Sequence, residues 1–135
     1  MSLTNKLLQL DVKKVASKPT KQFEVKRLSE LAKEPILFTC QALDGELWND
    51  IQRQSVDLSK KGNLKDIRVF EMQLMTCVEG VIEPDLKDKK LLEHYGVPTP
   101  KDLLKKMLLP GEIADLNKII SELSGYEAND DDIKN

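Results

Sequence analysis

Residues 64–82 read LKDIRVFEMQLMTCVEGVI, and the rest of the expected fold is arranged around this segment. Its apolar side chains recur every three or four positions, which is the spacing of one face of an α-helix. The stripe consists of Ile67, Phe70, Leu74, Cys77, Val78 and Val81. We therefore expect a long central helix over residues 64–82, with this stripe in the core.

The opposite side of the expected central helix is apolar as well. Val69 and Met72 lie on the far side from the stripe, and Met75 lies on its flank. A single core cannot cover so wide an arc, so this side either packs under other elements or contacts a partner. We favour a partner contact, because methionine offers a flexible apolar surface. Val69, Met72 and Met75 are therefore candidate protein-binding residues.

Two segments before the central helix show the alternation typical of strands. Residues 22–27 alternate apolar and polar side chains, and the segment containing Ile36, Phe38 and Cys40 does the same. Residues 28–35 separate the two segments, which is long for a tight turn, so we expect an antiparallel pair joined by a loop. Two strands are not stable alone, and helices must cover one face.

Capping signals divide the remaining chain into further helices. Asp44 and Asp88 precede helical patterns, and Gly96 ends the short helix that begins after Asp88. Thr99-Pro100 and Pro110-Gly111 each start another helix. The expected fold is therefore α+β and mostly helical: an N-terminal helix, a β-strand pair, and about five helices packed as one domain.

The N-terminal residues 3–16 predict a helix with two apolar stripes. One stripe holds Leu3, Leu7 and Leu10, and the other holds Leu8, Val12 and Val15. We expect one stripe to pack on the protein's own core and the other on a neighbouring copy or a partner, so Leu3, Leu7 and Leu10 are candidate protein-binding residues. The expected organisation is an N-terminal helical arm (1–17), a linker (18–22), a single α+β domain (23–125) and a disordered acidic tail (126–135).

Composition and charge argue against membrane and nucleic-acid partners. The 135 residues carry 21 Lys and Arg against 23 Asp and Glu, a net charge of -2, which disfavours bulk affinity for nucleic acid or anionic membranes. No apolar run approaches the roughly 20 residues of a membrane span, and the N-terminus does not look like a signal peptide. We expect a cytoplasmic protein.

Residue types that carry chemistry are scarce. The single histidine, His94, excludes a histidine-rich metal site, and Cys40 and Cys77 are too few for a zinc site or a disulfide framework. We expect both cysteines to be reduced and buried. No glycine-rich phosphate loop and no carboxylate pair in an apolar setting occur. We therefore expect no cofactor, no metal and no enzymatic activity.

A DNA-binding role is the alternative to a protein-binding one. The two short helices on either side of residues 96–100 resemble a helix-turn-helix, with Lys101, Lys105 and Lys106 facing away from the leucines of the second helix. That helix lacks the Arg, Asn or Gln that read base edges, and the whole chain is acidic. A gel-shift experiment with duplex DNA distinguishes a regulator of this kind from a protein that binds proteins.

Three segments of the C-terminal half resemble a known family. They are EGVIEPDLKD at residues 79–88, YGV at 95–97 with Thr99-Pro100, and LLPGEIADL at 108–116 continuing through IISELSG at 119–125. Together they are similar to the XkdN-like family of phage tail assembly chaperones, closely over residues 79–126. The order of the earlier elements also fits this family, whereas residues 41–65 carry no family motif and the acidic tail lies outside the resemblance.

This resemblance implies a small, non-enzymatic cytoplasmic protein of a tailed phage or prophage. Its expected partner is the tape measure protein, which such chaperones are thought to coat and keep soluble until tail tube subunits polymerise around it. The tail tube protein is a further implied partner, and self-association is expected. The chaperone is absent from the finished tail. In related phages, ribosomal frameshifting also produces a longer form.

Overall fold

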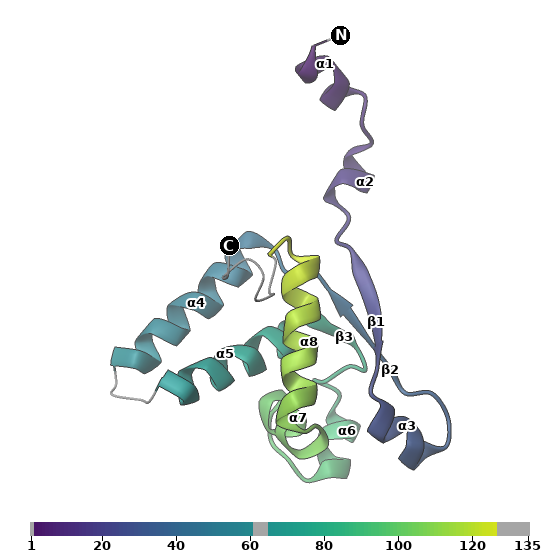
Figure 1. The fold of residues 1–135 in the computed structure, drawn as a ribbon, viewed down its shortest axis with the longest axis vertical. Helices are drawn as coiled ribbons and strands as arrows, with labels where there is room; N and C mark the ends of the chain where they lie inside the picture. The colour runs from purple at the N-terminus through teal and green to yellow at the C-terminus, as the bar shows by residue number, and fades with distance from the viewer. Residues whose placement is uncertain (1, 61–64, 127–135) are drawn as a thin grey trace, which may run out of the picture.

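The computed structural model describes residues 2–60 and 65–126, and its N-terminal segment projects from the rest of the protein, which we call the body (Figure 1). Its elements are α1 (Leu3–Leu8), α2 (Val12–Ala16), β1 (Thr20–Glu24), α3 (Lys26–Ala32), β2 (Leu37–Gln41), α4 (Gly45–Lys60), α5 (Lys65–Gly80), β3 (Val81–Glu83), α6 (Lys89–Tyr95), α7 (Pro100–Met107) and α8 (Pro110–Leu123). The mostly helical α+β class expected from the sequence is confirmed.

The sheet is antiparallel, with the strands in the order β1-β2-β3. Phe23 of β1 lies opposite Phe38 of β2, and the pairing of β2 with β3 shifts register between Thr39 and Cys40. The expected strand pair is therefore present, but the sheet has a third strand that the sequence pattern did not predict. The expected central helix extends to residue 82, because Val81 continues its apolar stripe, whereas Val81 and Ile82 belong to β3.

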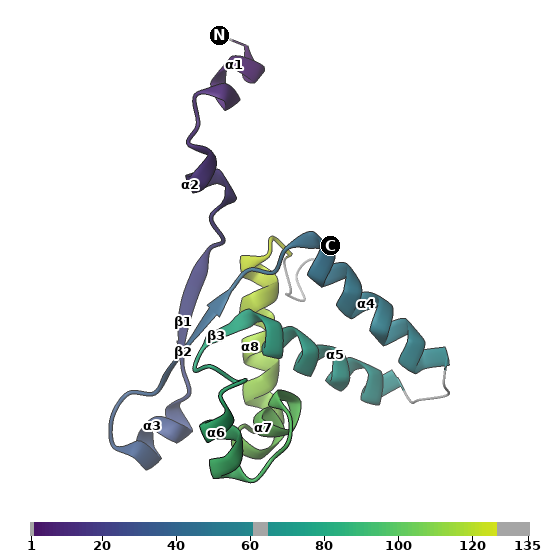
Figure 2. The same cartoon turned by 180° about the vertical axis from the view of Figure 1, so that it is seen from behind.

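The core lies where α5, α7 and α8 meet the sheet. Helix α8 packs on α5 and against β1 and β2, and α5 also packs on α4 and α7. Figure 2 shows α4 and α5 from behind as a hairpin that extends to one side of the body. Fully buried large side chains of this core include Phe38, Leu74, Leu103, Leu104, Ile113, Leu116 and Ile120.

The expected central helix is present as α5, but it ends at Gly80. Leu74 and Cys77 of its stripe are fully buried, as expected. A Cβ atom at Gly80 would lie only 2.5 Å from the Cδ1 atom of Ile120. Helices α5 and α8 therefore approach closely at Gly80, and this residue has no room for a side chain.

The predicted helix caps are confirmed. The carboxylate of Asp44 accepts a hydrogen bond from the backbone N–H of Leu47 at 2.9 Å, and that of Asp88 accepts one from Leu91 at 3.0 Å. Thr99 caps α7 in the same way, and Gly96 ends α6 with a φ of 68°. Local capping chemistry thus places the boundaries of α4, α6 and α7.

The expectation of a loop over residues 28–35 is wrong, because most of these residues belong to helix α3. The first strand also ends at Glu24, so residues 25–27 are not part of it. The N-cap residue of α3, Val25, offers no side-chain acceptor, and the helix ends at Lys33, a lysine with a φ of 60°. Neither end of α3 carries the residue types that usually mark a helix terminus.

The expectation of a single helix over residues 3–16 is also wrong, because this segment forms two helices, α1 and α2. The carboxylate of Asp11 accepts a hydrogen bond from the N–H of Lys13 at 2.9 Å, which starts α2 as a separate helix. Ser2 caps α1, because its hydroxyl accepts a hydrogen bond from the N–H of Asn5 at 3.2 Å. No residue of α1 or α2 is buried, so the expectation that one apolar stripe packs on the protein's own core is contradicted.

The C-terminal tail lies mainly outside the described residues. Of the expected disordered acidic tail at 126–135, the structure describes only Tyr126. The Tyr126 ring stacks on Trp48 of α4, with ring centroids 4.3 Å apart. Residue 126 therefore packs against the body.

Candidate functional site

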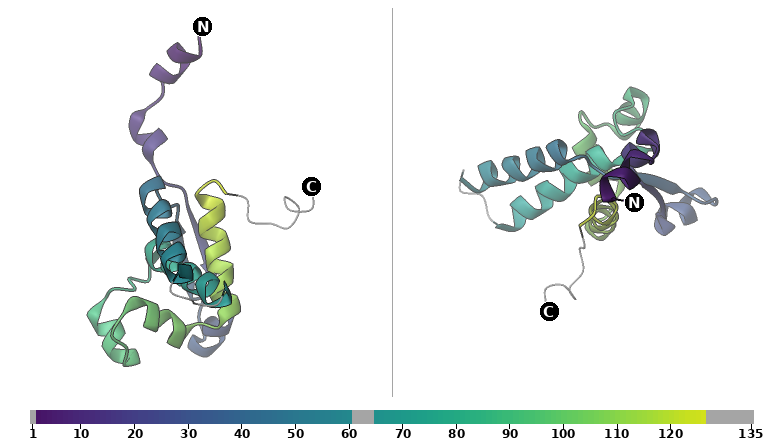
Figure 3. Two further views of the ribbon diagram at one scale, coloured as in Figure 1. Left: turned by 90° about the vertical axis from the view of Figure 1, so that its left-hand side faces the viewer. Right: turned by 90° about the horizontal axis from the view of Figure 1, so that it is seen from above.

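The N-terminal segment carries six exposed large apolar side chains. We call residues 2–16 the arm; it projects from the body, as the left panel of Figure 3 shows. Its large apolar side chains have between 52% (Leu10) and 79% (Val12) of their surface exposed. They are Leu3, Leu7, Leu8, Leu10, Val12 and Val15. Exposure on this scale is typical of a surface that binds another molecule.

A second apolar surface is a groove of about 560 Å³ beside α3. We call it the α3 groove; α3, β2, the β3–α6 connection and α6 build its walls. Leu31 at its edge is 73% exposed, and Leu37 is 42% exposed. The complete lining is Leu28, Leu31, Ala32, Pro35, Ile36, Leu37, Phe38, Glu83, Pro84, Leu91, Tyr95 and Met107.

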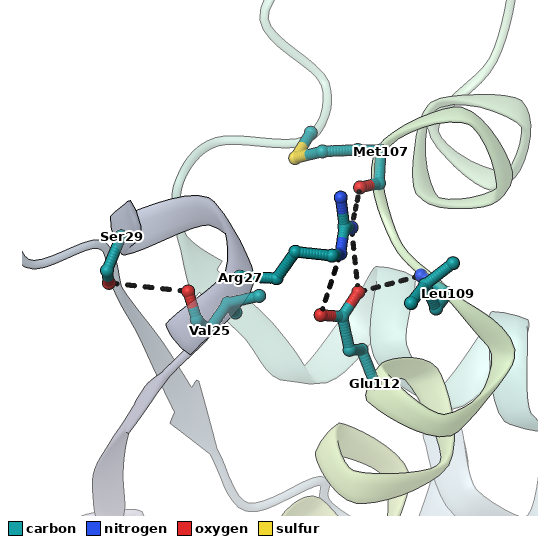
Figure 4. Close-up of polar contacts among 6 residues, drawn as sticks. All are labelled: Val25, Arg27, Ser29, Met107, Leu109 and Glu112. Atoms are coloured by element: carbon teal, nitrogen blue, oxygen red, sulfur yellow. Dashed lines mark hydrogen bonds and ion pairs between the residues drawn. The ribbon is translucent and has the colours of Figure 1, made fainter. Parts of the chain in front are cut away.

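An ion pair fixes the α3 wall of this groove to the start of α8 (Figure 4). The Arg27 guanidinium donates hydrogen bonds to both carboxylate oxygens of Glu112, at 2.8 and 3.2 Å, and to the carbonyl of Met107 at 2.8 Å. The Glu112 carboxylate also accepts a hydrogen bond from the N–H of Leu109 at 2.7 Å. Hydrogen bonds from Arg27 hold the pKa of Glu112 below its ordinary value, against the opposing effect of burial.

A serine holds the connection between α3 and β2. The Ser29 hydroxyl donates to the carbonyl of Val25 at 3.3 Å and accepts from the N–H of Ile36 at 2.8 Å. The second bond joins α3 to the residue that precedes β2. Two residues of α3, Arg27 and Ser29, therefore hold this wall of the groove to α8 and to the residue before β2.

A third apolar surface is a smaller hollow of about 280 Å³ between α4, α5 and α7. Leu47 and Ile51 of α4 line it together with Met75 and Val78 of α5. At its α7 side, Lys101 lines the hollow and forms an ion pair with Glu71 of α5 at 3.1 Å. We call this surface the α5 hollow.

The candidate residues expected from the sequence fall into two separate places. Leu3, Leu7 and Leu10 lie on the arm, away from α5. On α5, Val69 is 38% exposed, whereas Met72 and Met75 are half-buried and pack against the core. The structure does not bring the two sets together, and their protein-binding role stays a prediction.

Sequence reasoning missed the α3 groove. Leu37 alternates with Ile36 and Phe38 at the start of β2 and is exposed, and an exposed leucine in a strand is a signal that could have pointed to this surface. The other walls come from segments far apart in the sequence, including Leu31, Leu91 and Tyr95. Their proximity depends on the tertiary fold and on α3, which was expected to be a loop.

Reactive side chains offer little chemistry in the described structure. Cys40 and Cys77 are free and buried, as expected, and burial raises their thiol pKa values to about 11 and about 12. A buried thiol with a raised pKa is a poor nucleophile. His94 lies exposed on α6, and the Lys101 ammonium of the expected helix-turn-helix is held by Glu71.

Residues 2–60 and 65–126 contain neither a cluster of metal ligands nor a membrane-spanning helix. No group of three or more His, Cys, Asp or Glu side chains in these ranges is placed to hold a metal ion. Within the same ranges, no helix combines the length and the apolar character needed to cross a membrane.

Comparison with known proteins adds to this geometry. The family model described as "Phage XkdN-like tail assembly chaperone protein" matches residues 4–135. The crystal structure of the protein yqbn is similar with a TM-score of 0.59, over 87% of this chain and 98% of that chain, at 20% sequence identity. At this identity, the likeness shows a shared fold.

A local likeness to a different kind of protein also occurs. Ribosome-recycling factors from two strains of Lactobacillus delbrueckii subsp. bulgaricus are 30% identical to this chain over 60 residues. The matched segment covers 44% of this chain and 32% of those relatives. The chain therefore spans about a third of their length.

Proposed function

Because the chain belongs to the XkdN-like tail assembly chaperone family, we propose that it binds the tape measure protein of its phage and keeps it soluble during tail assembly. The observation that carries this proposal is the family match over residues 4–135, nearly the whole chain. We infer that the protein acts by binding and without catalysis. It acts in the cytoplasm of the host cell and is absent from the finished tail.

The exposed apolar surfaces support a binding role. A chaperone must cover apolar segments of its client without recognising one fixed sequence, and leucine and methionine side chains adapt to such segments. The α5 hollow is open and lined by side chains of this kind, including Met75. Val69 is 38% exposed on another side of α5, outside the lining of the hollow.

We assign tape measure binding to two sides of α5, the α5 hollow and the separate surface that carries Val69. An amphipathic helix of the client can place apolar side chains every three or four residues into a groove between helices. The Glu71–Lys101 ion pair at 3.1 Å joins two walls of the hollow, so the hollow exists before the client arrives. The tail tube protein is a further proposed partner.

Co-expression tests this proposal. The tape measure protein is produced alone and together with the chain, and its soluble fraction is measured and followed by affinity pull-down. We expect the chain to move most of the tape measure protein into the soluble fraction and to co-purify with it. If the partner stays as insoluble as it is alone, the proposed function is wrong.

A paired substitution tests the assigned surface. Val69→Asp combined with Met75→Gln places polar groups on α5, and we expect at least a fivefold loss of co-purified tape measure protein, which corresponds to about 1 kcal/mol. Leu109→Asp is the matched control, because Leu109 is 53% exposed and lies at the start of α8. Equal losses with both variants would show that binding occurs elsewhere.

A further inference from the structure

We propose that the arm of one copy of this chain docks in the α3 groove of a second copy, so that two copies exchange arms. This inference goes beyond the proposed function, because it concerns contacts between copies of the same chain. Its test requires no other tail protein. The two proposals can therefore fail independently.

The arm needs a surface to pack on. Helix α1 has six residues and α2 has five, and helices of this length are marginally stable in water without tertiary contacts. Both helices have no buried residue. An apolar groove would remove their leucine and valine side chains from water.

The α3 groove matches the arm in polarity and in charge. Its lining is apolar apart from Glu83 and the hydroxyl of Tyr95. A neighbouring hollow shares Pro84 and Leu91 with the groove and is lined by Asp85 and Asp88 against one lysine, Lys90. The arm carries the opposite balance, with lysines at 6, 13 and 14 against one aspartate at 11. Opposite charges at the rim favour docking and select its orientation.

The position of the arm favours a groove on another copy. In the register of β1 and β2, Thr20 lies opposite Gln41 and Glu24 lies opposite Leu37. The arm joins the Thr20 end of β1, whereas the α3 groove lies at the Glu24 end. Figure 1 shows the arm pointing away from α3. The arm and the groove of one copy are therefore at opposite ends of the strand.

A twofold-symmetric pair of copies would place each arm near the α3 groove of the other copy. If two copies lie with their β1 strands antiparallel, the arm of each reaches toward the groove end of the other. Each copy then gives one arm and receives one, which is the reciprocal pattern of a twofold interface. Strand β1 is at the edge of the sheet, so the approach of a second copy along this side is not blocked by another strand.

Light scattering coupled to size exclusion tests this inference on the full chain. The arm variant carries Leu3→Asp, Leu7→Asp and Leu10→Asp, and the groove variant carries Leu31→Asp and Leu37→Asp. All five side chains are exposed, so the substitutions leave the body folded, as circular dichroism would confirm. Val69→Asp, on α5, is the control. We expect the mass of two chains for the wild type and the control, and the mass of one chain for each variant.

Mixing the two variants provides the decisive measurement. The arm variant keeps an intact groove and the groove variant keeps an intact arm, so a mixture can form one of the two contacts. The two variants carry different affinity tags. We expect pull-down by either tag to recover pairs that contain one chain of each variant. A wild type with the mass of one chain, variants that still pair, or a mixture without mixed pairs would each overturn the proposal.

Discussion

Glu112 joins three parts of the chain at the start of α8. Its carboxylate accepts hydrogen bonds from Arg27 of α3 and from the N–H of Leu109, while Arg27 also donates to the carbonyl of Met107 at the end of α7. A carboxylate at this position also interacts favourably with the positive end of the helix dipole. Glu112 thus contacts α3 directly and is linked to α7 through Arg27.

Stability should depend on pH through Glu112. Hydrogen bonds from Arg27 lower its pKa below the ordinary 4.5, so ionised Glu112 stabilises the folded chain above that value, and this contribution is lost as the pH falls through the lower folded-state pKa. We expect Glu112→Gln to lower the Tm by about 2 to 4 °C at neutral pH. Thermal unfolding across the acidic range should show this difference shrinking.

Glu122→Gln is the control for this measurement, because Glu122 lies exposed on the same helix. Its Tm should follow that of the wild type at every pH. If the Tm of Glu112→Gln stays below that of the wild type by the same amount at the lowest pH, the ion pair is not the cause of the difference.

Gly80 is a second residue on which the packing of the body depends, because α5 and α8 approach closely there. An added Cβ atom would meet three side-chain atoms of Ile120 at 2.5 to 2.8 Å, and Ile120 is fully buried. We expect Gly80→Ala to lower the free energy of unfolding by about 1 to 3 kcal/mol, because α5 and α8 must move apart. Urea unfolding measures this loss.

Gly45→Ala is the matched control for Gly80→Ala, since a Cβ atom at the first residue of α4 meets nothing within 4 Å. It should be neutral or slightly stabilising. Equal stability of the two variants would mean that the α5–α8 contact adjusts without strain.

Helix α5 combines a buried face with a partly exposed one, and its two sides should respond differently to charge. Met72 packs half-buried against the core, so we expect Met72→Asp to cost about 1 to 3 kcal/mol of unfolding free energy. Val69 is 38% exposed, and Val69→Asp should change stability by about 0.5 kcal/mol or less. Thermal unfolding of both variants provides the comparison.

The same two variants connect stability with partner binding. Val69→Asp should weaken pull-down of the tape measure protein while the fold stays intact. If Met72→Asp melts like the wild type, Met72 is not part of the core. If neither substitution weakens the pull-down, α5 is not the contact surface.

The elements that sequence reasoning predicted correctly are those with local signals. Asp44, Asp88 and Thr99 cap helices through side-chain oxygens that any reader of the sequence can locate. Helix α3 was missed because Val25 offers no capping oxygen and Lys33 adopts a conformation more typical of glycine. Strand β3 was missed because the apolar stripe of α5 continues into Val81, and only pairing with β2 makes it a strand.

At the scale of the whole molecule, the body and the arm differ in the burial of their apolar side chains. In the body, Leu74 and Cys77 of the predicted α5 stripe are fully buried, because neighbouring elements pack on this helix. The arm has similar stripes, and its isolation could not be predicted, because burial depends on how the chain turns at residues 17–19. The same holds for the α3 groove, whose walls come from segments as distant as Leu28 and Met107.

Protease digestion should show whether the projecting arm is free or is covered by another molecule. Lys6, Lys13 and Lys14 are exposed on helices of a few residues, where the backbone opens readily to a protease. Trypsin should trim this segment before it attacks the body, and Lys14 is the last site before the body that it can use, because Pro19 follows Lys18. Any molecule that covers the arm slows this trimming, so the lifetime of the intact chain under digestion reports how much of the arm is engaged.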